Sequence, residues 1–150
     1  MNLMLLSESR RNTKLRKSES IEYRIRGLSL APGSAKICPH ATNSCRISCV
    51  GSVNVGMSSI FPSIQAGRDR KTEWLIRDRK GFLSQLRKEI SAEQQTAENN
   101  GEQLVLRLNT FSDLDWSDLF YDFPYVIGYD YSKVHSRHQR IVRGDWPANY

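Results

Sequence analysis

Hydrophobic and polar residues alternate along parts of the chain in a way that predicts three β-strands. Within residues 22–30, Tyr23 and Ile25 alternate with Arg24 and Arg26, and apolar residues follow, as is typical of a strand with one buried face. Two further apolar runs, residues 103–108 and 125–131, predict a second and a third strand. These three segments are the expected strands of one sheet.

Helical patterns fill the interval between the first two predicted strands. Residues 60–76 are expected to form one helix, with Ser58 or Ser59 as its N-cap. A second helix is expected to begin after Asp78 as N-cap and to end at Gly101, with apolar residues recurring on one face. The segment between the first two strands is therefore predicted to be mainly helical in its second half.

A short helix is predicted between the second and third strands. Residues 112–115, Ser-Asp-Leu-Asp, have the spacing of a capping box, and Ser112 is interpreted as a helix cap. Trp116, Leu119 and Phe120 would lie on this helix. Beyond Lys133 the pattern dissolves, and no further element is predicted.

Strands that alternate with helices imply crossover connections and a parallel sheet. The chain is therefore expected to be an α/β protein with a small open parallel sheet of about three β/α units. This resembles part of a barrel, with a long cysteine loop after the first strand. Residues 1–20 are interpreted as a loosely held basic arm, and residues 21–150 as a single α/β domain. An open sheet leaves an unpaired edge, so association into a homo-oligomer through that edge is one expectation.

Composition excludes two classes of protein. The chain has 150 residues, of which 39% are hydrophobic, which is too apolar for a disordered protein of this length. Mean hydropathy is -0.55 and no apolar stretch approaches the length of a membrane span, so no membrane partner is expected. The first six residues lack the features of a signal peptide, which predicts a cytoplasmic protein.

Positive charge is concentrated at the beginning of the chain. The formal net charge is +6, and the first 50 residues hold nine basic and three acidic residues. Such a cluster attracts nucleic acid or a phosphate-bearing ligand, although a solvated basic tail explains it equally well. The candidate phosphate-binding residues are Arg10, Arg11, Lys14, Arg16 and Lys17, together with Arg68, Arg70 and Lys71 on the first predicted helix.

The three cysteines fall inside one short segment with the spacing C-x6-C-x3-C. Cys38, Cys45 and Cys49 are an odd number, and a disulfide framework is not expected in the cytoplasm. Three thiolates on one loop could hold an iron–sulfur cluster, or zinc with His40 as the fourth ligand. The remaining alternative is that the cysteines pack as small hydrophobic residues.

Three polar loops are expected to meet at one edge of the predicted sheet. Loops that leave the carboxyl ends of parallel strands share an edge, and ligands bind there. The loops are the cysteine segment, residues 109–113 and residues 130–133. Candidate cofactor-binding residues in these loops are Asn109, Ser112, Asp113 and Lys133. The plainer alternatives are a helix cap for Ser112 and a surface ion pair for Lys133.

Motifs from residue 12 onward resemble a family of tailed-phage proteins, the gene product eighty-eight family of mycobacteriophages. They include Cys38-Pro39-x-Ala41, Cys45-x-x-x-Cys49, Arg107-Leu108-Asn109 and Tyr129-Asp130-Tyr131-x-Lys133. The resemblance implies a phage or prophage origin and a cytoplasmic protein made in the infected host cell. The family implies longer proteins with further strands, so this chain is expected to be a truncated or divergent member.

A more distant similarity is to radical-S-adenosylmethionine enzymes, which place a three-cysteine loop after the first strand of a β/α barrel. Their usual spacing is C-x3-C-x2-C, which differs from that of this chain. The similarity implies an iron–sulfur cluster and S-adenosylmethionine as cofactors. The leading hypothesis is therefore a phage-encoded protein with an iron–sulfur cluster on Cys38, Cys45 and Cys49, and whether it is a radical-type enzyme is left open. The alternative is a zinc-stabilised module that binds nucleic acid or a host protein.

Overall fold

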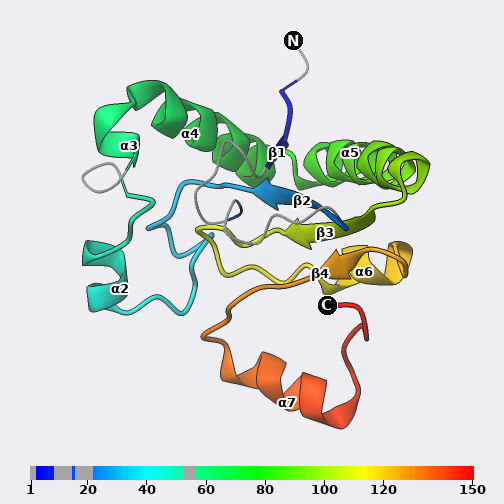
Figure 1. Ribbon diagram of the computed structural model, residues 1–150. Coiled ribbons are helices and arrows are strands. Elements are labelled where there is room, and N and C mark those ends of the chain that lie inside the picture. The colour runs from blue at the N-terminus through cyan, green and yellow to red at the C-terminus, as the bar shows by residue number, and fades with distance from the viewer. Residues whose placement is uncertain (1–2, 9–14, 16–21, 53–56) are drawn as a thin grey trace.

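A four-stranded mixed sheet forms the centre of the protein (Figure 1). The computed structural model describes residues 3–8, 15, 22–52 and 57–150. The strands lie in the order β1 (Leu6–Glu8), β2 (Tyr23–Leu28), β3 (Gln103–Arg107) and β4 (Ile127–Gly128). Strand β1 is antiparallel to β2, whereas β2, β3 and β4 are parallel. The α/β class is confirmed, but the prediction of a purely parallel sheet is wrong.

Strand β1 lies inside the segment that the sequence suggested was a loosely held arm. Leu5 and Leu6 are buried, and the carboxylate of Glu89 accepts hydrogen bonds from both of their backbone N–H groups, at 2.8–2.9 Å. The ammonium group of Lys71 donates to the carbonyl of Leu5 at 2.7 Å. Contacts with residues more than 60 positions away therefore hold these residues against the sheet.

Helices lie around the sheet. The described ones are α2 (Asn43–Ile47), α3 (Met57–Ile60), α4 (Pro62–Arg77), α5 (Arg79–Asn100), α6 (Ser117–Asp122) and α7 (His135–Arg143). Figure 1 shows α4 and α5 along one side of the sheet and α7 projecting on the opposite side. Helix α7 begins where no element was predicted. None of the described helices is both long enough and apolar enough to cross a bilayer.

Helix boundaries follow local signals in one case and depart from them in another. The carboxylate of Asp78 accepts a hydrogen bond from the N–H of Gly81 at 2.9 Å, and Gly101 ends α5 with φ +68°, as predicted. Helix α4 instead begins after Phe61, which makes no side-chain cap bond. The prediction of Ser58 or Ser59 as its cap is wrong, because Pro62 begins a new helix after the short α3.

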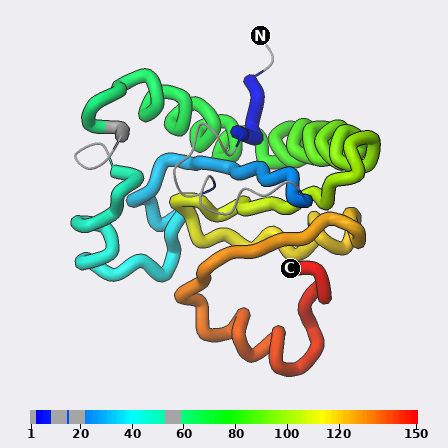
Figure 2. The backbone as a smooth tube through the Cα atoms, in the orientation of Figure 1, coloured from blue at the N-terminus to red at the C-terminus, as the bar shows by residue number. Residues whose placement is uncertain are grey.

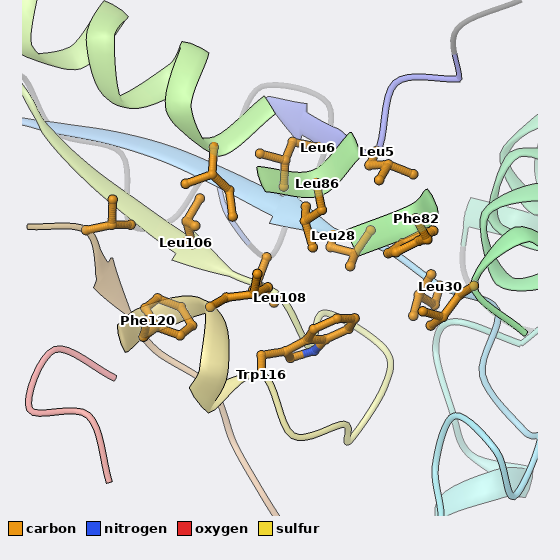
Figure 3. Close-up of a cluster of buried hydrophobic side chains, with 14 of the residues drawn as sticks. Leu5, Leu6, Leu28, Leu30, Phe82, Leu86, Leu106, Leu108, Trp116 and Phe120 are labelled. Carbon is orange, nitrogen blue, oxygen red and sulfur yellow. The ribbon is translucent and has the colours of Figure 1, made fainter. Parts of the chain in front are cut away.

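Side chains alternate between the two faces of the sheet and form two separate clusters. The larger one contains Leu28, Leu106 and Leu108 from the strands and the segments that follow them. Phe82 and Leu86 of α5 pack on these leucines, as Figure 3 shows. The smaller cluster, on the opposite face, consists of Leu15, Ile25 and Val105, with Tyr129 packed against it.

The C-terminal residues return to the outer edge of β4 (Figure 2). The carbonyl of Asn149 accepts a hydrogen bond from the N–H of Gly128 at 2.6 Å. The side-chain amide of Asn149 donates to the carbonyl of Val126 at 2.7 Å, and the Tyr150 ring stacks on Phe120 at 4.1 Å. These contacts partner backbone groups of Val126 and Gly128 at the β4 edge, so the end of the chain covers one open edge of the sheet.

Candidate functional site

The three polar segments predicted to meet at the carboxyl edge of the sheet do meet there. The N–H of Asp113 donates to the carbonyl of Ile37 at 3.0 Å. The thiol of Cys38 donates to the carbonyl of Phe111 at 3.5 Å. The N–H of Asn109 donates to the carboxylate of Asp130 at 3.0 Å. These bonds confirm the expected convergence of the cysteine segment with the loops after β3 and β4.

Asn109 is the centre of the loop that follows β3. Its side-chain oxygen accepts hydrogen bonds from the hydroxyl of Ser112, the N–H of Leu114 and the indole of Trp116, at 2.8–3.0 Å. Its amide group donates to the carbonyl of Leu114 at 2.9 Å. Asn109 is only 4% exposed, so a single buried amide organises the whole turn.

The helix cap predicted at Ser112 is not formed. Helix α6 begins after Trp116, and the carboxylate of Asp115 accepts from the N–H of Ser117 at 2.9 Å. The Ser112 hydroxyl bonds to Asn109 instead, because the turn folds back toward the end of β3. The prediction of Ser112 as a cap is therefore wrong, and its role in the structure is to support Asn109.

Asp130 is a buried carboxyl group with three kinds of donor around it. It accepts from the hydroxyl of Tyr150 at 2.9 Å and from the backbone and side chain of Asn109. Burial raises the pKa of Asp130 from 3.8 to about 6, although these hydrogen bonds and the charge of Arg107 act in the opposite direction. The same burial, together with the Asp130 charge, raises the pKa of Tyr150. Near neutral pH the site therefore contains a carboxyl group that can exchange a proton.

We expect the stability of the protein to fall as the pH rises through the titration of Asp130. A raised pKa favours the folded state below about pH 4, and this contribution is lost as the pH approaches the folded pKa of about 6. The rise from 3.8 to about 6 corresponds to about 3 kcal/mol. The measurement is the free energy of unfolding by urea between pH 4 and 8 for the natural protein and Asp130→Asn. Parallel curves for the two proteins would contradict the prediction, because asparagine does not titrate.

Asp113 joins the loop after β3 to the segment after β4 and to α7. Its carboxylate accepts from Arg137 at 2.7 Å and from the hydroxyl of Ser132 at 2.9 Å, and the N–H of Lys133 is 3.2 Å away. A second Arg137 nitrogen donates to the backbone carbonyl of Asp113 at 2.9 Å. Asp113 and Arg137 are both buried, so this ion pair fixes the relative positions of three segments.

The cysteine segment is partly helical rather than one long loop. Cys45 lies in α2, which is capped by Thr42, and Cys49 follows the end of the helix. All three cysteines are free and half-buried. Helix α2 has no buried residue, whereas a loop without structure had been expected. The four-residue spacing of Cys45 and Cys49 allows both thiols to lie on one side of this segment.

The three thiols lie within electrostatic range of one another and of two cations. Burial raises the pKa of Cys38, and the charges of Cys49, Cys45 and Asp113 act in the same direction. The ammonium group of Lys133 hydrogen-bonds to Cys45, which raises the pKa of Lys133. Among the described residues, histidine, cysteine, aspartate and glutamate side chains form no group of three or more that could hold a metal ion. His40 is exposed in the turn before α2.

The predicted phosphate-binding residues do not form one exposed surface on α4. Arg68 is buried, donates to the carbonyl of Gly51 at 2.9 Å and lies 4.2 Å from the centre of the Phe111 ring. Lys71 bonds to the Leu5 carbonyl, and only Arg70 of the three is exposed. The other five, in the N-terminal segment, lie outside the described residues: Arg10, Arg11, Lys14, Arg16 and Lys17.

Sequence analysis missed Arg107, Arg137 and Tyr150 as parts of this edge. Arg107 is the last residue of β3, on the opposite face from Leu106, and strand alternation could have placed it there. Arg137 and Tyr150 carried no local signal, because their partners Asp113 and Asp130 are 20 or more residues away.

The fold and the site define a class: a small α/β protein whose sheet edge gathers buried polar side chains and three free thiols. The chain belongs to the gene product 88 family, whose model matches residues 4–150. This confirms the family resemblance seen in the sequence, whereas the likeness to radical-S-adenosylmethionine enzymes finds no support. Neither the curated proteins nor the solved structures contain a match to the chain.

Proposed function

We propose that residues 38–49 bind an iron–sulfur cluster through Cys38, Cys45 and Cys49. The observation that carries this proposal is the gathering of three free, half-buried thiols at the edge where the loops after β2, β3 and β4 converge. Thiolates are the ligands that iron–sulfur clusters use in proteins. Three-cysteine ligation leaves one iron of a four-iron cluster open to a further ligand.

The surroundings of the thiols suit a group with negative charge. The ammonium group of Lys133 bonds to Cys45, and the charge of Cys49 raises the pKa of the Arg68 guanidinium against the larger, lowering effect of burial. Both cations would offset the charge of thiolate ligands. Binding requires the thiols to lose their protons, and the raised pKa of Cys38 makes loading favour higher pH.

Loading requires the cysteine segment to close, since the described residues hold no ready-made metal-binding group. Helix α2 has only five residues and buries none of them, so its rearrangement breaks few apolar contacts. Cys38 is held in place more firmly, because its neighbour Ile37 is buried and bonds to Asp113. Closure would therefore bring Cys45 and Cys49 toward Cys38.

Removal of single thiols is expected to abolish the cluster. Protein purified without oxygen and reconstituted with iron and sulfide should hold about four iron atoms per chain and absorb visible light. Cys38→Ser, Cys45→Ser and Cys49→Ser should each lose most of this iron. Ser48→Ala is the matched control, because Ser48 is exposed in the same segment and has no thiol. The measurement is iron, zinc and sulfide content per chain.

Two other results decide between the alternatives. Zinc in place of iron, with a loss of zinc in His40→Ala, would replace the cluster by a zinc site on the same cysteines. The proposal would be overturned by a colourless protein that contains neither iron nor zinc and whose metal content is the same in the cysteine variants. Binding of S-adenosylmethionine to the loaded protein is the corresponding expectation for an enzyme, and calorimetry on the same preparation tests it.

A further inference from the structure

Side chains on the two faces of the sheet belong to different clusters. Leu106 and Leu108 face a large core supplied by α4, α5 and α6. On the opposite face, Ile25 and Val105 of the strands cluster with Leu15. We call the face that bears Val105 the Val105 face.

Arg107 lies on the Val105 face at the carboxyl end of β3. Its guanidinium carbon is 5.7 Å from the centre of the Tyr129 ring and 5.2 Å from that of Tyr131. Its Nε is buried and has no hydrogen-bond partner among the described residues. A buried guanidinium N–H without an acceptor is unusual in a folded protein, because it loses its water without compensation.

Tyr129 presents a second unsatisfied donor at the same place. Its ring packs against the cluster of Leu15, Ile25 and Val105, and its hydroxyl is buried without a partner in the described structure. Asp130 is the acidic residue next to Tyr129 in the sequence, and its charge interacts with that of Arg107. Its oxygens, however, accept hydrogen bonds from Asn109 and Tyr150. Two buried donors, one at the end of β3 and one just after β4, therefore lack an acceptor among the described residues.

We propose that Arg107 and Tyr129 bind an anionic oxygen group, a carboxylate or a phosphate, on the Val105 face. The planar guanidinium donates in a fork that matches two anionic oxygens, and the rings of Tyr129 and Tyr131 lie close to it. The Tyr129 hydroxyl supplies a further donor. This site is separate from the three cysteines, and its anion binding needs no metal.

The test uses the Nε–Hε resonance of Arg107 in the full ¹⁵N-labelled chain. Inorganic phosphate and succinate are titrated separately, so that the two arms distinguish a phosphate from a carboxylate ligand. One of them should shift the Arg107 resonance along a saturable curve. Arg107→Lys keeps the charge but loses the fork, and it should bind that anion at least tenfold more weakly. Arg77→Lys, an exposed arginine paired with Glu73, is the matched control and should bind it as the natural protein does.

Tyr129→Phe is the second variant, and it keeps the test decisive if Arg107→Lys does not fold. It removes only a hydroxyl that has no partner, so folding should be preserved and binding weakened severalfold. Linear shifts with both anions, or equal affinities for the Arg107→Lys and Arg77→Lys proteins, would overturn the proposal. The titration is repeated with Cys45→Ser, where binding should persist. A failure of anion binding is thereby distinguished from a failure of cluster binding.

Discussion

Replacement of Asn109 by alanine is expected to lower the free energy of unfolding by about 3–5 kcal/mol. The side-chain oxygen of Asn109 accepts from three donors, of which the Trp116 indole and the Ser112 hydroxyl belong to buried residues. Alanine would leave these donors unsatisfied, and each buried unsatisfied group costs about 1–3 kcal/mol. The measurement is urea unfolding followed by circular dichroism and by tryptophan fluorescence, to which Trp116 contributes together with Trp74 and Trp146.

Two variants show whether this loss belongs to the network rather than to asparagine in general. Asn99→Ala removes an exposed amide on α5 and should change stability by less than about 0.5 kcal/mol. Ser112→Ala removes one donor and should cost about 1 kcal/mol. If Asn109→Ala were as stable as Asn99→Ala, the loop after β3 would have to be held by something other than this amide.

The elements that sequence analysis predicted correctly are those whose signals are local. Helix α5 carries its own N-cap in Asp78, its own terminator in Gly101 and a buried stripe that includes Phe82 and Leu86. Strand β3 has three consecutive buried apolar residues, Leu104 to Leu106, and helices pack on one side of it. In these segments, neighbours in sequence supply most of the interactions that decide the structure.

The elements that were missed depend on distant partners. Strand β1 has three residues, and its adjoining N–H groups bond to Glu89, more than 80 positions away. Helix α7 has one buried residue, Arg137, and so lacks the apolar stripe by which helices are recognised. Ion pairs with Asp113 and Asp115 connect it to the loop after β3. No local sequence pattern predicts either element.

Predictions for the candidate site also divide into those that local signals support and those that depend on distant residues. The convergence of the three loops followed from strand order, and it is confirmed by the bonds of Asn109 and Asp113. The function of individual side chains did not follow. Ser112 has the spacing of a cap but bonds to Asn109, and Arg68 was assigned to a charged surface but is buried beside Phe111. Their environments come from segments far away in sequence, which residue type and spacing do not specify.

Arg137→Met is expected to destabilise the protein by about 3–5 kcal/mol, because it leaves Asp113 buried without its counter-ion. Asp113→Asn should cost a similar amount, and the double variant should recover much of the loss, since no unpaired charge is then buried. Arg140 and Asp115 form the matched pair on the same two segments, but their side chains are 42% and 43% exposed, against 10% and 12% for Arg137 and Asp113. This exposed pair should couple by at most about 1 kcal/mol. Urea unfolding of both double-mutant cycles measures the two coupling energies. Equal values would mean that burial does not strengthen the Asp113 pair, and Asp113 would then be free to serve a ligand instead of the fold.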